Sequence, residues 1–306
     1  MKYIITGGAG FIGSHLAEEL VKRRKKVVVI DNLSTGNLTN LVSIRNKIEF
    51  INGDILELSL LKKVVSKGDI IFHQAALPSV ARSLQDPLLS NRVNVEGTLN
   101  VLVASRDAKA KRVIFASSSS VYGDSVKLPK TETMCPNPKS PYALTKLTAE
   151  TYMRLFYRLY GLETASIRYF NVFGPRQDPT SQYSAVIPRF ISMIKEGKRP
   201  IIYGDGKQSR DFTYVANVVN ANILASESKE ACGEFMNVAC GERFTLLRLI
   251  KELEKIIGKK AIVSFFDERK GDVKHSLADI RKAKELIGYE PKVKFTEGLN
   301  KTVASF

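Results

Sequence analysis

The chain alternates between short continuous apolar runs and segments with helical periodicity. The apolar runs predict buried strands at Lys2–Thr6, Lys26–Asp31, Ile48–Asn52, Asp69–His73, Arg112–Ser117 and Glu163–Tyr169. The segments between them predict helices at Phe11–Arg24, Glu57–Ser66, Pro87–Ala108 and Pro141–Tyr160. This alternation is typical of a parallel sheet covered by helices on both faces. We therefore predict an α/β fold with a doubly wound parallel sheet of the Rossmann type.

The pattern changes after about Gly174. The elements become shorter, and turn signals such as PRQDP, GDG and CGE follow one another closely. We expect a first domain at residues 1–173 and a smaller C-terminal α/β lobe at residues 174–306. Part of 205–240 is expected to return to the first domain.

Residues 7–13, with the sequence GGAGFIG, lie between the first predicted strand and the first predicted helix. Glycines let backbone amides approach a pyrophosphate closely, and the helix N-terminus stabilises its negative charge. A glycine motif alone is weak evidence. Its place between a strand and a helix favours a dinucleotide-binding loop.

Asp31 ends the second predicted strand, about 20 residues after the glycine motif. A carboxylate there accepts hydrogen bonds from the ribose hydroxyls of NAD and repels the 2′-phosphate of NADP. The alternative is that Asp31 only caps a turn. Asp54 and Ile55 follow the third strand and either bracket the adenine or form a plain turn. The pattern predicts NAD as the cofactor.

Tyr142 and Lys146 lie at the start of a predicted helix, and their i, i+4 spacing places them on one face. A phenol has a pKa near 10. A neighbouring ammonium and a nicotinium ring would favour its ionised form, so Tyr142 can act as a base near neutral pH. The preceding strand ends in serines 117–120, at the edge of the sheet where ligands bind. One of these serines can bond the same sugar hydroxyl, unless the run is only a polar loop.

Composition adds few constraints. The chain has 306 residues, of which 44% are hydrophobic and 25% charged, as in ordinary soluble proteins. Its three cysteines and three histidines are scattered, so we expect no disulfide framework, no metal site and a cytoplasmic location. No stretch has the ~20 apolar residues of a membrane span, and no secretory signal is visible.

The net charge is +16, which suits either nucleic acid or a doubly charged nucleotide substrate. The basic residues form scattered short runs, such as KRRKK at 22–26 at the end of a predicted helix. Basic residues there complement the helix dipole and are solvated. We therefore expect no nucleic-acid partner and no membrane contact.

Eight segments together carry a family resemblance: GGAGFIG, DNLSTG, HQAA, SSSSVYG, SPYALTK, RYFNVFG, GDGKQSRDF and RKGD. Over nearly its whole length the chain resembles the extended short-chain dehydrogenase/reductase family, in its nucleotide-sugar epimerase branch. The resemblance implies that Ser118, Tyr142 and Lys146 are the catalytic triad.

The resemblance also implies two sets of ligand contacts. The residues implied to bind NAD are Gly7, Gly10, Phe11, Ile12, Gly13, Asp31, Asn32, Ser34, Thr35, Gly36, Asp54, Ile55, Ala75, Ala76, Asn94, Ser117, Tyr142, Lys146 and Tyr169. The residues implied to bind a UDP-hexose are Ser79, Ser118, Asn171, Val186, Pro188, Tyr203, Arg210, Arg269, Asp272 and Ser276. Arginine suits the UDP part because its planar fork binds phosphate oxygens bidentately.

The implied reaction is inversion at C4 of the sugar. Tyr142 removes the C4 hydroxyl proton, hydride passes to NAD, the 4-keto sugar rotates, and hydride returns to the opposite face. Dehydratases of the family carry an Asp-Glu pair directly after the catalytic Ser or Thr, and decarboxylases keep the Glu. This chain has Ser119 and Ser120 there, which cannot donate protons near neutral pH. A non-catalytic NAD-binding protein is a further alternative, against which the intact triad argues.

Two finer expectations rest on the resemblance. A residue shortly after the R-x-G-D stretch lines the sugar pocket, and counting from Asp272 gives Ser276, or His275 if the register slips by one. A small residue there leaves space for an N-acetyl group on the sugar. The alternative is that Ser276 lies in an exposed turn and has no effect on substrate choice. The helices predicted at Pro87–Ala108 and Pro141–Tyr160 resemble the family's dimer-forming bundle, so we expect a homodimer.

Overall fold

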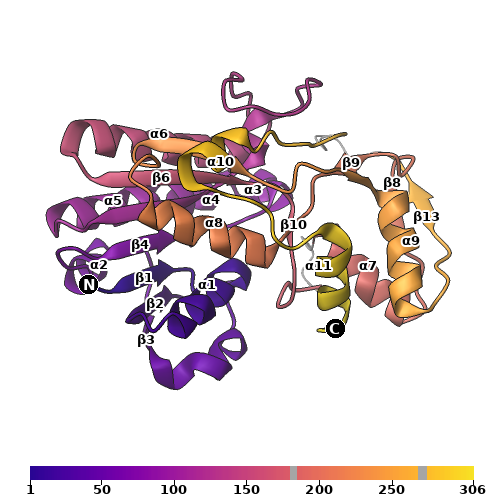
Figure 1. Ribbon diagram of the computed structural model, residues 1–306, viewed down its shortest axis with the longest axis horizontal. Helices are drawn as coiled ribbons and strands as arrows, with labels where there is room; N and C mark the ends of the chain where they lie inside the picture. The colour runs from indigo at the N-terminus through magenta and orange to yellow at the C-terminus, as the bar shows by residue number, and fades with distance from the viewer. Residues whose placement is uncertain (180–184, 268–273) are drawn as a thin grey trace.

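The main sheet of the computed structural model has seven parallel strands in the order β11-β6-β5-β4-β1-β2-β3 (Figure 1). The structure describes residues 1–179, 185–267 and 274–306. The strands of this sheet are β1 (Tyr3–Thr6), β2 (Val27–Asp31), β3 (Ile48–Asn52), β4 (Ile70–His73), β5 (Arg112–Ser118), β6 (Glu163–Tyr169) and β11 (Glu234–Val238). The predicted α/β fold with a doubly wound parallel sheet is confirmed.

Both faces of the sheet are covered by helices. Alternate strand residues face opposite sides, so Ile5 and Val29 pack in one core while Ile4 and Val28 pack in the other. The first core is covered by α1 (Phe11–Lys22) and α8 (Val215–Glu227), and the second by α2 (Leu58–Val64), α5 (Gly97–Asp107) and α6 (Pro141–Tyr160). Burial on both sides explains why the strands are continuously apolar in sequence.

The helix predicted over Pro87–Ala108 is a single run with a distortion in its middle. It consists of α4 (Pro87–Asn91), the π-helical turn η2 (Arg92–Glu96) and α5. The turn carries the buried Asn94, whose side chain accepts a hydrogen bond from Leu77 N (2.8 Å) and donates one to Thr145 (3.1 Å). The periodicity did not reveal α3 (Val80–Gln85), η1 (Leu38–Lys47) or η3 (Ser119–Tyr122).

Among the described residues, the C-terminal lobe contains three two-stranded sheets and three helices. Its strand pairs are β7 (Val172–Phe173) with β10 (Thr213–Tyr214), β9 (Ser209–Arg210) with β12 (Phe244–Thr245), and β8 (Ile201–Tyr203) with β13 (Ser264–Phe266). Its helices are α7 (Val186–Lys195), α9 (Leu246–Ile257) and α11 (Phe295–Val303), whereas α10 (Arg281–Ile287) packs on β11 and α8 of the main domain. Stacking of Phe295 on Phe244 (4.1 Å between ring centroids) and on Phe212 (5.5 Å) joins these pieces.

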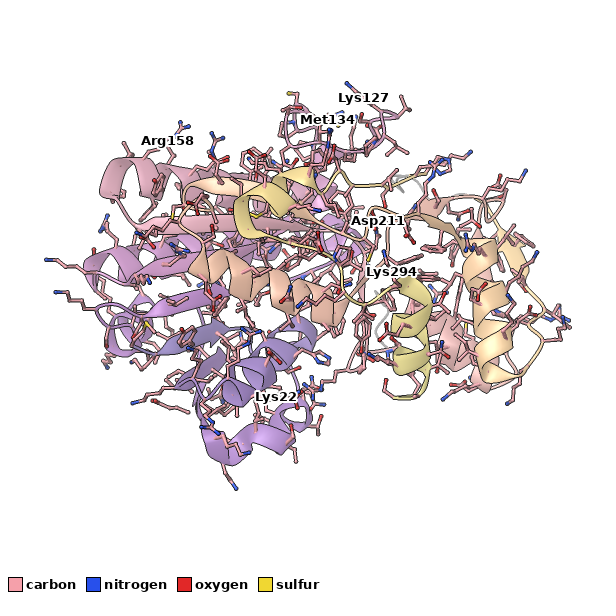
Figure 2. All side chains as sticks on the ribbon, viewed as in Figure 1. Lys22, Lys127, Met134, Arg158, Asp211 and Lys294 are labelled. Carbon is pink, nitrogen blue, oxygen red and sulfur yellow. The ribbon has the colours of Figure 1, made fainter. Side chains whose placement is uncertain are left out.

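A buried carboxylate joins the lobe to the main sheet. Asp211, labelled in Figure 2, accepts hydrogen bonds from the backbone N–H groups of Cys240, Gly241 and Ala278 at 3.0–3.2 Å. Burial raises the pKa of Asp211 to about 7, and these three bonds oppose the shift. Because Asp211 follows β9 directly, the bonds fix that strand against two loops from later in the chain.

The turn from β1 into α1 leaves no space for a side chain at Gly7 or Gly13. Gly7 has a φ of +70°, and a Cβ there would lie 2.6 Å from the backbone nitrogen of Ala75. A Cβ on Gly13 would lie 2.2 Å from the carbonyl oxygen of Gly7. Only glycine therefore lets α1 approach β1 this closely.

We expect Gly13→Ala to destabilise the fold by about 2–3 kcal/mol, because a backbone oxygen cannot move aside as a side chain would. The measurement is the free energy of unfolding by chemical denaturation. The control is Gly197→Ala, where no atom lies within 4 Å of the added Cβ, although φ there is +70° whereas Gly13 is helical. That control should lose only the strain of a left-handed alanine, about 1 kcal/mol. Equal losses in the two variants would contradict the close contact.

Candidate active site

The N-terminus of α1 is suited to an anion. Its N-cap is Gly10, which makes no side-chain capping bond, and the first turn holds no acidic residue. The first N–H groups of a helix have no partner inside the helix. Here these groups, on Phe11, Ile12 and Gly13, stand at the carboxyl edge of the sheet. A phosphate would be stabilised there by the amides and the helix dipole.

Asp31 is fixed beside this helix terminus. Its carboxylate accepts hydrogen bonds from Ala9 N (2.9 Å) and Leu33 N (2.8 Å). Gly36 closes the loop over it, since a Cβ on Gly36 would lie 2.9 Å from both carboxylate oxygens. Burial raises the pKa of Asp31, and the two backbone bonds counteract this. The sequence-predicted aspartate and glycine loop are therefore brought together.

The other residues predicted to bind a cofactor surround this edge. Asn32 donates to Asp54 (2.8 Å), while Ser34 and Thr35 are exposed on the same loop. Ile55 is buried, and Ala75 and Ala76 are half-buried beyond β4. The hydroxyl of Tyr169 is held inside by Gln74 (3.1 Å) and Asn222 (3.0 Å), two residues that the sequence analysis did not single out.

The three residues predicted to be catalytic meet where α6 packs on β5. The Lys146 Nζ donates to Ala116 O (2.8 Å) and lies 6.0 Å from the ring centroid of Tyr142. The hydroxyl of Tyr142 is hydrogen-bonded to Ser118. The Ser118 hydroxyl also accepts two hydrogen bonds from Ser120, one from the Ser120 N–H (3.2 Å) and one from the Ser120 hydroxyl (2.9 Å).

Burial opposes charge on both members of the Tyr–Lys pair. It raises the pKa of Tyr142, an effect that the hydrogen bond with Ser118 reduces. It lowers the pKa of Lys146 to about 7. In a site of low dielectric an ammonium near the phenol favours the phenolate more strongly than it would in water. The neighbouring His73 is neutral, since burial and the Lys146 charge lower its pKa to about 3.

A pocket of about 240 Å³ extends from the carboxyl edge of the sheet into the C-terminal lobe. Four of its lining residues were predicted from sequence, namely Asn171, Val186, Tyr203 and Arg210. Arg189 and Gln208 also line it and were missed. Gln208 lies in the GDGKQSRDF segment and Arg189 directly follows Pro188, but nothing in their spacing marked them.

Comparison with known proteins identifies the family. Residues 4–302 match the family model described as GDP-mannose 4,6 dehydratase. A putative UDP-glucose 4-epimerase of Methanocaldococcus jannaschii is 39% identical, with 98% of this chain and 96% of that protein covered. The chain belongs to the extended short-chain dehydrogenase/reductase family of NAD-dependent epimerases and dehydratases.

Solved structures of this family superpose closely. A UDP-N-acetylglucosamine 4-epimerase from Methanobrevibacter ruminantium, in complex with UDP-N-acetylmuramic acid, is 43% identical with a TM-score of 0.95 over 100% of this chain and 97% of the other. A Thermus thermophilus UDP-glucose 4-epimerase in complex with NAD is 35% identical, with a TM-score of 0.91 over 100% and 98% of the two chains. A Bacillus cytotoxicus UDP-N-acetyl-α-D-glucosaminuronate decarboxylase is 34% identical over 99% and 97%. The family thus contains several reactions at similar identity.

Two of the residues predicted to bind the substrate have unusual backbone conformations. Ser79 has a φ of 110° and caps α3, its hydroxyl accepting from Arg82 N (3.3 Å). Asn171 has a φ of 35° and lies two residues beyond β6. Positive φ in residues other than glycine concentrates where ligands bind, because the surrounding contacts must hold the strained conformation.

Ser276 is buried, with 8% of its surface exposed, and does not form an exposed turn. Its hydroxyl accepts from Asn171 Nδ2 (3.0 Å) and from Asp211 N (3.3 Å). His275 instead contacts Ser209 (2.9 Å). Between the two registers considered from sequence, Ser276 is therefore the one tied to the pocket residue Asn171.

Some predicted residues serve the framework or lie outside the description. Ser117 donates its hydroxyl to Glu150 (2.8 Å), and Asn94 holds the Leu77 backbone. If Ser117 or Asn94 contacts a cofactor, it must do so through atoms that these hydrogen bonds do not use. Pro188 is buried in α7 and does not line the pocket. Arg269 and Asp272 lie outside the described residues.

Across residues 1–179, 185–267 and 274–306, no group of three or more His, Cys, Asp or Glu side chains could hold a metal ion. Within the same ranges, no helix has the length and apolar character needed to cross a bilayer.

The burial of Lys146 predicts a pH-dependent stability. Between about pH 7, the folded pKa, and 10.5, the ordinary value, the unfolded chain binds a proton that the folded chain has lost. The buried ammonium therefore destabilises the fold fully below pH 7, and the penalty vanishes as pH rises to 10.5. Lys146→Met keeps the unbranched chain without the charge. The difference in melting temperature between Lys146→Met and the parent should be largest below pH 7. It should fall steadily as the pH rises from 7 to 10.5.

The measurement is thermal unfolding of nucleotide-free protein across this pH range. Lys229→Met, at an exposed position, is the control and should show no such trend. A constant difference between Lys146→Met and the parent at all pH values would contradict the buried charge.

Proposed function

We propose that this chain inverts the configuration at C4 of a UDP-hexose, with NAD as a retained cofactor. The proposed substrates are UDP-glucose and UDP-galactose, and also UDP-N-acetylglucosamine and UDP-N-acetylgalactosamine. One observation carries the proposal. Ser118, Tyr142 and Lys146 are assembled at the carboxyl edge of the sheet, and Asn171, two residues beyond the neighbouring strand β6, lines a pocket together with Tyr203 and Arg210. Such a group can move a proton at a sugar hydroxyl while the pocket holds the nucleotide.

NAD, when bound, takes up a hydride from the sugar and returns it, so it is unchanged after each turnover. We propose that residues 1–173, with part of 205–240, bind it, and that 174–306 mainly bind the nucleotide sugar. The uncapped amides at the start of α1 would face the pyrophosphate. Asp31 would accept the ribose hydroxyls and exclude a 2′-phosphate. NAD in a related structure supports this assignment.

The chain's own groups account for the proton transfer. Tyr142 accepts the proton of the C4 hydroxyl and later returns it. Ser118, already bonded to the phenol, holds the same hydroxyl in line. Lys146 stabilises the phenolate by its charge, and its bond to Ala116 O fixes its place. After oxidation the sugar must rotate, so only the nucleotide part should be held firmly, and Tyr203 and Arg210, which line the pocket, would hold it.

Dehydration or decarboxylation is less well supported. A relative of this length and similar identity is a decarboxylase, so family membership alone does not decide. Loss of the C6 hydroxyl needs an acid beside the sugar. Here Ser119 and Ser120 follow Ser118, and hydroxyl groups are poor acids near neutral pH.

We also propose that the protein is a homodimer. Leu84, Leu88 and Leu144 are 63%, 83% and 54% exposed. They lie on α3, α4 and α6, which pack against one another. Large exposed apolar side chains on one set of packed helices are typical of a surface that is covered by a partner.

Replacing the proposed base tests the function. Tyr142→Phe keeps the ring and removes the proton-accepting oxygen, so turnover should fall roughly 10²–10⁴-fold while the Kd for UDP stays the same. The assay follows interconversion of UDP-glucose and UDP-galactose. Tyr157→Phe, at an exposed position on the same helix, should keep full activity. Near-normal turnover in Tyr142→Phe would show that another group is the base.

Substrate size is tested at Ser276. We expect Ser276→Tyr to abolish activity on the N-acetylated sugars selectively, because a ring there cannot overlap the acetamido group without overpacking. The readout is the ratio of kcat/KM for UDP-N-acetylglucosamine to that for UDP-glucose. Ser276→Ala loses the same hydrogen bonds without adding bulk and should leave the ratio unchanged. Equal ratios in parent and Ser276→Tyr would remove Ser276 from the sugar pocket.

A further inference from the structure

Three consecutive residues of β5 are each tied to one face of α6. Ala116 O accepts from Lys146, the Ser117 hydroxyl donates to Glu150, and Ser118 is hydrogen-bonded to Tyr142. The α6 residues are spaced i, i+4 and i+8 and so lie in one row along the helix. Two of the three contacts involve the proposed base and its lysine. The third, at Glu150, has no role in the proposed chemistry.

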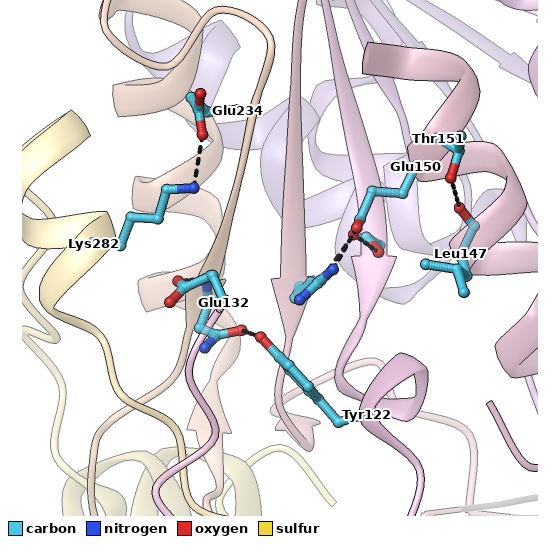
Figure 3. A network of polar contacts seen from close by, with 10 residues as sticks. Tyr122, Glu132, Leu147, Glu150, Thr151, Glu234 and Lys282 are labelled. Carbon is cyan, nitrogen blue, oxygen red and sulfur yellow. Dashed lines mark hydrogen bonds and ion pairs between the residues drawn. The ribbon is translucent and has the colours of Figure 1, made fainter. Parts of the chain in front are cut away.

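Glu150 is held by a second partner from the adjacent strand. Arg168 donates to both carboxylate oxygens of Glu150, at 2.9 Å and 2.5 Å. Their side chains are 1% and 4% exposed. The Arg168 guanidinium is also enclosed between the rings of Tyr122 (4.7 Å) and Phe235 (4.2 Å). In Figure 3, Glu150 extends from its helix toward the sheet, and a dashed line marks its polar contact there.

Stability alone does not explain a buried pair of this kind. Removing two charges from water is unfavourable, and apolar residues of similar volume often stabilise a fold as well or better. What the pair provides is a geometric constraint. The two donor bonds of Arg168 fix the carboxylate in orientation, and the Ser117 hydroxyl fixes it along β5. Arg168 and Ser117 are also register partners in the sheet.

We propose that Glu150 and Arg168 are positioning residues, which set how far along β5 the helix α6 lies and thereby place the Tyr142 hydroxyl beside Ser118. This inference rests on the proposed function. One helical turn separates Glu150 from Lys146, and a second separates Lys146 from Tyr142. A small shift of α6 at Glu150 would therefore displace the reacting oxygen. Misplacement by about 1 Å can lower a rate by about 10²-fold.

The chain contains a matched control. Arg112 and Glu163 form an ion pair (2.7 Å) between the same two strands, β5 and β6, at the opposite edge of the sheet. Arg112 is also buried, and it donates to the carbonyl oxygens of Ala225 and Ser228. Glu163 is 35% exposed, so this pair is less buried than Glu150–Arg168, and removing it does not touch α6.

The experiment compares Glu150→Leu/Arg168→Met with Arg112→Met/Glu163→Leu. Turnover number, the Kd for UDP, and hydrogen exchange of the α6 amides are measured for both and for the parent. We expect the first variant to lose at least about 10-fold in kcat. Its UDP affinity should stay within twofold, and exchange should rise over residues 141–150. The second variant should keep its kcat and its α6 protection, whatever its melting temperature.

Two results would overturn the proposal: a kcat within twofold of the parent in the first variant, or an equal loss in the control. If the first variant does not fold, Ser117→Ala removes only the strand's bond to Glu150. It should then lower kcat and raise α6 exchange at unchanged UDP affinity, and unchanged exchange would count against the proposal. Hydrogen exchange does not depend on the reaction. An inactive parent with the expected exchange pattern would therefore reject the proposed function and keep the positioning role.

Discussion

Helix α6 packs on β5 and presents Tyr142, Lys146 and Glu150 in one row. Strand β5 contributes a hydrogen-bond partner for each of the three, and the neighbouring strand β6 contributes a second partner for Glu150. Polar groups lose their hydration when they are buried, so such a row is stable only if every member is paired. The same burial tunes the acid–base properties of the site. It lowers the pKa of Lys146 to about 7 and strengthens the effect of each nearby charge on the pKa values of its neighbours. The fit of this helix on this strand therefore determines both the packing and the electrostatics of the site.

Two other parts of the molecule complete the site around this helix and strand. On one side, the glycine turn brings α1 close to β1, so that the helix N-terminus and Asp31 stand on the same sheet edge. On the other side, Asp211 ties the C-terminal lobe to the loop after β11, the aromatic cluster around Phe295 joins the pieces of the lobe, and the pocket lies there. The parallel sheet makes this possible, because every strand ends at the same edge.

Much of the fold could be predicted from sequence because its signals are local. Apolar runs on a sheet buried on both faces stand out, and six strands were placed within one residue of their observed starts. The exceptions have physical causes. The π turn around Asn94 arises from tertiary hydrogen bonds to Leu77 and Thr145, which periodicity does not record. Likewise α3 and the two-residue strands of the lobe are too short to show a period.

For the site, the sequence by itself determined the residue types and their local spacing: the glycine turn, Asp31 at a strand end, and Tyr142 with Lys146 on one helical face. These are properties of neighbours in the chain, governed by backbone geometry. Only the tertiary structure decided that Glu150 and Arg168 meet behind Ser117, that Ser276 bonds Asn171, and that Arg189 and Gln208 line the pocket. Those contacts join residues up to 105 positions apart. They depend on how helices and loops pack, which no local pattern encodes.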